Sequence, residues 1–242
     1  MRALSATQIL DLWEEGHASL PFERAVSLLA AAMPDLEREE LELLSIGRRD
    51  ARLLELREWA FGSSLEMTAS CPVCGQALEM VIPIGTLRTP PAVEEPESRI
   101  AMEEYAADFR PPNTRDLAVC DGLDPEEGRR ALLNGCILEA TRAGEMISAH
   151  ELPNELLTAV EDRIAAIDPQ ADVLLDFACP DCHERWSEAF DIVSFFWAEI
   201  DAWARRLLLE VNVLARAFGW SEDDILRMSA ARRQIYFAMA QA

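Results

Sequence analysis

The sequence predicts an α+β fold that is mainly helical and contains a split four-cysteine zinc ribbon. Two observations support this class: most of the chain spaces its apolar residues at helical intervals, and two shorter stretches alternate apolar and polar residues around a C-P-x-C motif. We expect a helical N-terminal segment over residues 1–62, the split ribbon over 63–191 with a helical insertion at about 97–170, and a C-terminal helical hairpin over 192–242.

The N-terminal segment predicts four short helices. Ser5 begins the capping-box pattern S-x-x-Q, and Gly16 ends the apolar periodicity that follows. Pro21 opens a second apolar segment, and Asp35 is expected to cap a third, acidic helix. Residues 48–59 again place their leucines at helical spacing. We therefore expect this segment to be helical throughout.

Two predicted hairpins carry the paired cysteines. Alternating residues lead into Cys71 and follow Cys74, which places the turn CPVCG at the tip of the first hairpin. The same layout recurs around Cys179 and Cys182 in the turn CPDC. Two such turns supply the four thiolates that a tetrahedral structural zinc site requires. The sequence therefore predicts one zinc ion per chain, with residues 75–178 separating its two halves.

Other interpretations of the cysteines are a redox-active dithiol and an iron–sulfur site. A redox C-x-x-C motif needs one pair at the start of a helix, whereas both pairs here lie in hairpins, so zinc is favoured. A saturated four-cysteine site leaves no open position for substrate, and the ion would stabilise the fold only. Cys120 and Cys136 are expected to be buried thiols, and His183 is either an exposed turn residue or an outer hydrogen-bond donor to the site.

Between the hairpins the chain predicts a proline-rich loop followed mainly by helices. The loop spans residues 83–96, and residues 99–110 add a strand. Helices are expected to start at Thr114 and, with proline at the first helical position, after Asp124. A further helix over residues 154–167 ends before an Asp-Pro pair.

The C-terminal part predicts one long helix over residues 192–218, then shorter ones after Ser221 and Ser229. Its aromatic residues and arginines are the side chains that dominate protein interfaces. We therefore expect this part of the chain to bind a partner. The candidate partner-binding residues are Trp220, Arg232, Arg233 and Tyr236.

The net charge of −22 argues against several classes of partner. The chain has 44 acidic and 22 basic residues, and every basic residue is an arginine, which excludes catalysis by lysine. An acidic surface repels nucleic-acid phosphates and anionic lipid, and only short arginine pairs interrupt it. No phosphate-binding loop or hydrolase motif is present. The sequence thus predicts a protein that is no enzyme and binds neither nucleic acid nor membrane.

The order of motifs resembles the T-even-type phage baseplate hub assembly protein family. GRRDARLLELREWAFG precedes the first hairpin, FRPPNTRDLA and the CPDC hairpin follow, and the chain ends in FFWAEIDAWARRLLLEVNVLARAFGWSEDDILRMSAARRQIYFAMA. The most specific part is G-W-S-E-x-D-I-L followed by R-R-x-x-Y. The resemblance implies a hub assembly chaperone or minor component, with baseplate or hub proteins of a contractile tail or injection particle as partners. The zinc prediction rests on the cysteines alone.

Two competing functions follow from the same features. A zinc-ribbon nucleic-acid-binding or regulatory adaptor would use the terminal helices as a helix-turn-helix, but the segment SAARRQIYFAMAQA carries only two basic residues. A dithiol oxidoreductase would use one cysteine pair. The N-terminus lacks the pattern of a secretory signal, so we expect cytoplasmic localisation, either during assembly only or also within a finished particle.

Overall fold

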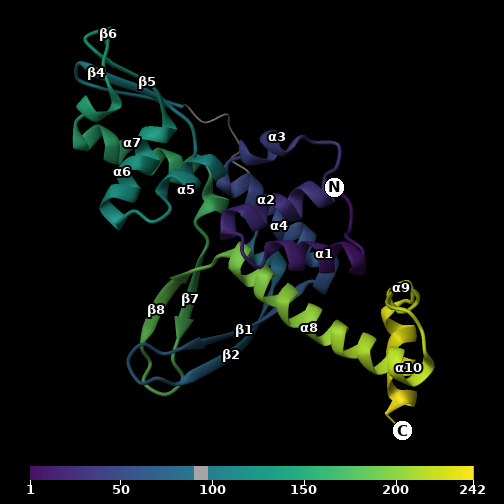
Figure 1. The fold of residues 1–242 in the computed structure, drawn as a ribbon. Coiled ribbons are helices and arrows are strands. Elements are labelled where there is room, and N and C mark those ends of the chain that lie inside the picture. Colours follow the sequence, from purple (N-terminus) through teal and green to yellow (C-terminus); the bar gives the residue numbers. More distant parts are fainter. Residues whose placement is uncertain (90–97, 242) are drawn as a thin grey trace.

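The computed structural model describes residues 1–89 and 98–241. Figure 1 shows four parts: a helical body, an arm of two β-hairpins, an insertion that contains both helices and strands, and a helical unit at the far end of one long helix. The fold is mainly helical with small antiparallel sheets, which confirms the predicted α+β class. Within the described ranges, no helix is both long enough and apolar enough to cross a bilayer.

Four helices form most of the body, as the sequence predicts. They are α1 (Ala6–Gly16), α2 (Pro21–Ala32), α3 (Arg38–Glu42) and α4 (Ile46–Phe61). The Ser5 hydroxyl accepts a hydrogen bond from the Gln8 amide, so the predicted capping box is present.

The third helix begins later than the sequence suggested. Asp35 is not its cap; the helix starts at Arg38, and the Glu37 amide donates to the Glu40 carboxylate. Glu40 lies three residues after Glu37, which is the spacing of a capping box.

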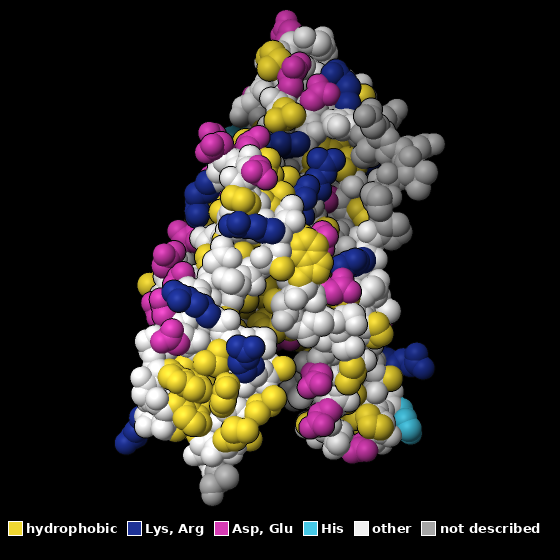
Figure 2. Space-filling model, turned by 90° about the vertical axis from the view of Figure 1, so that its right-hand side faces the viewer, with side chains coloured by type: hydrophobic (Ala, Val, Ile, Leu, Met, Phe, Trp, Pro, Cys, Tyr) yellow, Lys and Arg dark blue, Asp and Glu magenta, His cyan; other side chains and the backbone are white. Residues whose placement is uncertain are grey.

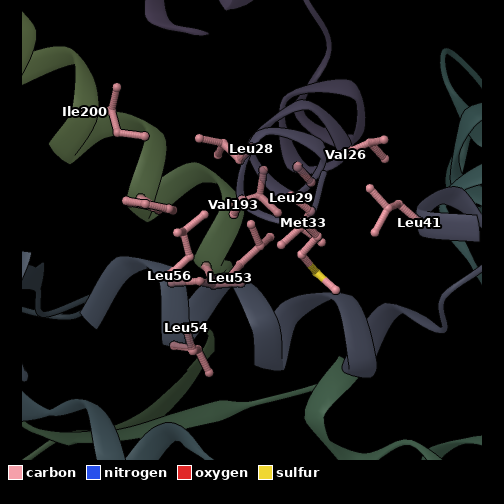
Figure 3. Packing of buried hydrophobic residues seen from close by; sticks show 14 of the residues in the cluster. Val26, Leu28, Leu29, Met33, Leu41, Leu53, Leu54, Leu56, Val193 and Ile200 are labelled. Carbon is pink, nitrogen blue, oxygen red and sulfur yellow. The ribbon is translucent and has the colours of Figure 1, made fainter. Parts of the chain in front are cut away.

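The core of the body is a set of aliphatic side chains on α2, α3, α4 and the first half of α8 (Ile192–Phe218) (Figure 3). The residues labelled in that view are Val26, Leu28, Leu29, Met33, Leu41, Leu53, Leu54, Leu56, Val193 and Ile200. Their burial on both sides of the interface anchors α8 to the body, because removing this much apolar surface from water dominates the stability of such a contact.

The arm consists of two antiparallel hairpins from distant parts of the chain. One pairs β1 (Ser64–Ser70) with β2 (Ala77–Pro83), and the other pairs β7 (Leu174–Ala178) with β8 (Arg185–Ala189). Both predicted hairpins are thereby confirmed. Figure 1 shows that they approach each other from different directions and meet at their tips.

The insertion between the hairpins is a mixed α/β unit, so the predicted helical insertion is wrong in this respect. A four-stranded antiparallel sheet has the order β3-β4-β5-β6. Its strands are β3 (Arg99–Met102), β4 (Tyr105–Phe109), β5 (Ile137–Arg142) and β6 (Glu145–Met146). The strand expected at 99–110 is in fact a hairpin. Phe109, Ala140, Leu156 and Val160 are buried together between sheet and helices.

Three α-helices belong to the insertion: α5 (Thr114–Cys120), α6 (Pro125–Cys136) and α7 (Asn154–Ile167). The Asp124 carboxylate caps α6 as predicted, whereas α5 is capped by Asn113 and begins at Thr114. The predicted start of the insertion at residue 97 and the second half of the predicted loop, residues 90–96, lie outside the described residues. Residues 84–87 of that loop form the short 3-10 helix η1 (Ile84–Leu87).

Hydrogen bonds attach the insertion to the body at two points. The Ile46 amide donates to the Pro112 carbonyl at 3.0 Å, and the buried Gly47 amide donates to the Asp168 carboxylate at 2.8 Å. A Cβ on Gly47 would lie 2.2 Å from that carboxylate, so only glycine permits this approach. The insertion is therefore held against α4.

The C-terminal unit packs against the second half of α8. It contains α9 (Glu222–Leu226) and α10 (Ala230–Ala240), and its buried apolar residues include Leu207, Leu214 and Ile225. The predicted long helix with shorter helices after it is confirmed.

Candidate metal centre

The tips of the two hairpins bring together the four predicted cysteines. The sulfurs of Cys71, Cys74, Cys179 and Cys182 all lie within 4.8 Å of one another. The Cys71–Cys182 and Cys74–Cys179 sulfur separations are each 3.5 Å, too long for disulfide bonds. Four sulfurs at about 2.3 Å from one zinc ion lie about 3.8 Å apart. The cluster therefore has the size and ligand set of a tetrahedral zinc site.

The two cysteine turns repeat the same backbone geometry. The Cys71 amide donates to the Gln76 carbonyl, and the Cys179 amide donates to the Glu184 carbonyl, at 2.9 and 2.8 Å. The residue four positions after the first cysteine has a positive φ in both turns: Gly75 at 75° and His183 at 63°. Each turn thus directs its two sulfurs toward the opposite hairpin.

Burial of the site is asymmetric. Cys71 and Cys179, the first cysteine of each pair, are buried, whereas Cys74 and Cys182 are exposed. Below the cluster, the rings of Phe177 and Trp186 stack with centroids 5.2 Å apart. The cluster thus closes the tip of the arm above an aromatic layer.

The thiols have unequal proton affinities. A hydrogen bond from the Cys74 amide is the main cause that lowers the pKa of Cys71 to about 7. The Glu184 amide also lowers the pKa of Cys182, but partial loss of hydration beside the other cysteines and the three neighbouring sulfurs outweigh it and raise that pKa to about 12. Several thiolates this close repel one another unless a cation lies between them. The donor set therefore fits a divalent ion.

In the part of the chain that the structure describes, these four cysteines are the group of potential metal ligands that converges on one point. Cys120 lies apart from it, with its sulfur 3.3 Å from the Gly128 carbonyl oxygen. Cys136 is buried, and burial raises its pKa to about 12, as expected for a thiol packed in an apolar interior. His183 is exposed on its turn.

Comparison with known proteins identifies the family. Residues 22–197 match the family model described as T4 bacteriophage base plate protein. The chain belongs to this family. The matched range of the baseplate protein runs from α2 into α8 and includes all four cysteines. No curated protein and no solved structure matches the chain.

The four partner-binding candidates of the baseplate protein have different environments. Trp220 stacks on Phe218, with ring centroids 4.6 Å apart, and meets the edge of Tyr236 at 4.8 Å. Arg233 is buried, lies 3.5 Å from the Glu210 carboxylate and donates to the Met228 carbonyl at 2.9 Å. Arg233 was expected to contribute to a partner-binding surface, but it is buried because its turn of α10 faces α8.

An exposed apolar face on α10 was missed by the sequence analysis. Ile235 and Met239 are 58% and 61% exposed, and the exposed Arg232 precedes them on the same side of the helix. Figure 2 shows hydrophobic side chains gathered on the lower left lobe, which the C-terminal helices form. The spacing 232, 235 and 239 marks one face of a helix, but sequence alone does not reveal which face packs against α8.

Proposed function

We propose that this baseplate-family protein is a non-enzymatic binding factor for assembly of a contractile tail or injection-particle baseplate, acting as a hub assembly chaperone or minor component. The match over residues 22–197 carries the proposal, since it supports a baseplate role for the region that includes the arm. The partners would be baseplate or hub proteins. We place its action in the cytoplasm, where thiols stay reduced and available to metal.

We further propose that Cys71, Cys74, Cys179 and Cys182 hold one structural zinc ion. The convergence of their sulfurs supports this assignment, and four thiolate ligands leave no position for substrate. Bound zinc would join the hairpins on either side of the insertion. Its contribution would be to fold stability and to the direction in which the arm projects.

The outer face of α10 is the proposed partner-binding element. Apolar side chains with an arginine at the edge are typical of interface centres, and Arg232, Ile235 and Met239 supply both. Trp220, Tyr236 and Arg233 would support this face from within by packing α10 against α8.

The test is particle assembly in cells that produce Ile235→Asp in place of the natural chain. Because Ile235 is exposed, purified Ile235→Asp should keep the melting temperature and metal content of the natural protein while the yield of assembled particles falls at least tenfold. Leu174→Asp on β7 is a matched control, since both residues are 58% exposed. Normal assembly with Ile235→Asp, or equal loss with Leu174→Asp, would contradict the assignment of this face.

The small number of basic side chains distinguishes the proposed function from that of a nucleic-acid adaptor. Binding that is carried by phosphate contacts requires several basic side chains, and affinity then falls steeply with salt. We expect no submicromolar binding of DNA or RNA at physiological salt in a mobility-shift assay. Such binding would favour the adaptor instead.

A further inference from the structure

A hollow of about 480 Å³ lies where the body, the insertion and the start of α8 meet. Its lining includes Phe22 of α2, Arg49 of α4, Leu117 of α5 and Ala189 at the end of β8. The volume falls within the range of roughly 300–1,000 Å³ that is common for ligand sites. None of these residues belongs to the cysteine cluster or to the outer face of α10.

Arg49 has unmet hydrogen-bonding capacity at this hollow. The residue is 4% exposed, and its Nε donates to the Asp50 carboxylate at 2.7 Å. Its Nη1 is buried and has no hydrogen-bond partner within the described residues. Buried donors are nearly always paired, because leaving one unpaired costs about 1–3 kcal/mol. Arg49 lines the hollow, so an acceptor bound there would satisfy this donor once the guanidinium turns toward it.

The charges around Arg49 favour an uncharged acceptor. Its guanidinium is already paired with Asp50, whose pKa is raised mainly by burial. Asp121 and Asp191 are exposed and also line the hollow, so a further carboxylate would meet negative charge. A main-chain carbonyl oxygen accepts hydrogen bonds without carrying a charge. Phe22 and Leu117 provide apolar surface beside it.

We propose that this hollow binds an extended, uncharged segment of a partner protein, which places an apolar side chain against Phe22 and Leu117 and a main-chain carbonyl at Arg49. The assignment of the occupant to a protein rests on the proposed assembly function. Because the lining comes from both the body and the insertion, the bound segment would also add contacts between them. The site is thus a second docking point, distinct from α10.

The probe is N-acetyl-leucine amide, which combines one apolar side chain with two uncharged carbonyl groups. We expect it to shift the methyl NMR resonances of Leu117 and Val193, both of which line the hollow, with a dissociation constant of about 1–10 mM for a ligand of this size. N-acetyl-leucine, which carries a carboxylate, should bind at least threefold more weakly. No shift with the amide, or tighter binding of the acid, would overturn the proposal.

Two independent variants localise the site. Arg49→Met combined with Asp50→Leu removes the donor together with its charge partner and should weaken binding of the amide at least tenfold. Ala189→Trp fills the hollow from an exposed position, leaves Arg49 in place and should abolish the shifts even if the double variant fails to fold. Arg48→Met, at an exposed neighbour, should bind as the natural protein does. Unchanged binding by Ala189→Trp would overturn the assignment.

Particle assembly in cells distinguishes this inference from the proposed function. Ala189→Trp should lower particle yield if a partner segment occupies the hollow. If Ala189→Trp assembles normally while Ile235→Asp does not, the hollow is not a docking point, and the assembly function stands.

Discussion

Glu199 accepts two hydrogen bonds from the buried guanidinium of Arg57, at 2.8 Å from Nε and 2.6 Å from Nη2. Arg57 also donates to the Gly62 carbonyl at 2.7 Å, directly before the first strand of the arm. One arginine on α4 therefore ties α8 to the base of the arm. Since Arg57 is only 2% exposed, its charge depends on these partners.

Glu199→Ala should lower the free energy of unfolding by about 2–4 kcal/mol, because it leaves the Arg57 charge buried without its carboxylate. Urea unfolding followed by circular dichroism measures the loss. Glu58→Ala is the control, since Glu58 pairs with Arg88 on the surface and such pairs contribute about 0–1 kcal/mol. Equal losses in the two variants would show that the buried pair contributes no more to stability than the surface pair.

His183→Gly should raise the free energy of unfolding by about 1 kcal/mol and leave metal content unchanged. His183 has a φ of 63°, a conformation that glycine adopts without the steric cost paid by other residues. The equivalent Gly75 in the first turn supplies the reciprocal variant, Gly75→Ala, which should lose a similar amount. Loss of metal from His183→Gly would instead assign the imidazole a role at the site.

Gly16→Ala should destabilise the protein by about 1–3 kcal/mol, although alanine favours helices. A Cβ at position 16 would lie 2.2 Å from the Trp197 ring, so the ring or the helix that carries it would have to shift. Gly85→Ala is the matched control, because nothing lies within 4 Å of the added methyl group. A stabilised Gly16→Ala in chemical denaturation would contradict this packing.

Asp116 should contribute to stability at neutral pH and lose that contribution in acid. Burial opposes its ionisation, but hydrogen bonds from Arg110 and the Asn113 amide outweigh burial and hold the pKa of Asp116 below its usual value. Its contribution is therefore complete above about pH 3.9, the unfolded pKa, and disappears as the pH falls through the lower folded pKa.

Asp116→Asn should accordingly cost about 1–3 kcal/mol at pH 7 and less below pH 4. The quantity to measure is the difference in unfolding free energy between natural and variant protein at each pH, because effects of acid elsewhere cancel in it. A difference that does not change with pH would show that the charge of Asp116 is irrelevant.

Local signals made much of the fold predictable. Ser5, Asp124 and Gly219 mark helix ends through capping and left-handed glycine geometry, and these rules act within one helical turn. The two cysteine turns could also be recognised in the sequence, because each is a short local motif. Their convergence was inferred from metal chemistry, since no local rule brings distant hairpins together.

The sheet of the insertion was not predicted because the sequence carries no clear signals where its strands begin and end. Helix α6 ends at Cys136 and β5 begins at Ile137, with no breaker between them. The hairpin from β5 to β6 turns at Ala143 and Gly144, both at positive φ, where asparagine followed by glycine would be the recognisable signal. Pairing with β4 therefore decides the conformation of this segment.

The burial of individual arginines was also not predictable. Arg49, Arg57 and Arg233 are all buried beside carboxylates, whereas the sequence shows only that arginines are present. Which side of a helix turns inward depends on its tertiary neighbours, and a long side chain reaches a carboxylate from either side. The hollow beside Arg49 could not be found without the structure for that reason.

The most direct test of the account is the zinc content of the folded chain. Native mass spectrometry of protein purified without added metal should detect one zinc ion per chain. Cys179→Ser should lose the ion, and its whole fold should melt at a lower temperature because the site joins both sides of the insertion. Cys120→Ser should retain the ion. Natural protein that is folded and free of zinc, or Cys179→Ser that still binds one ion, would contradict the four-cysteine centre.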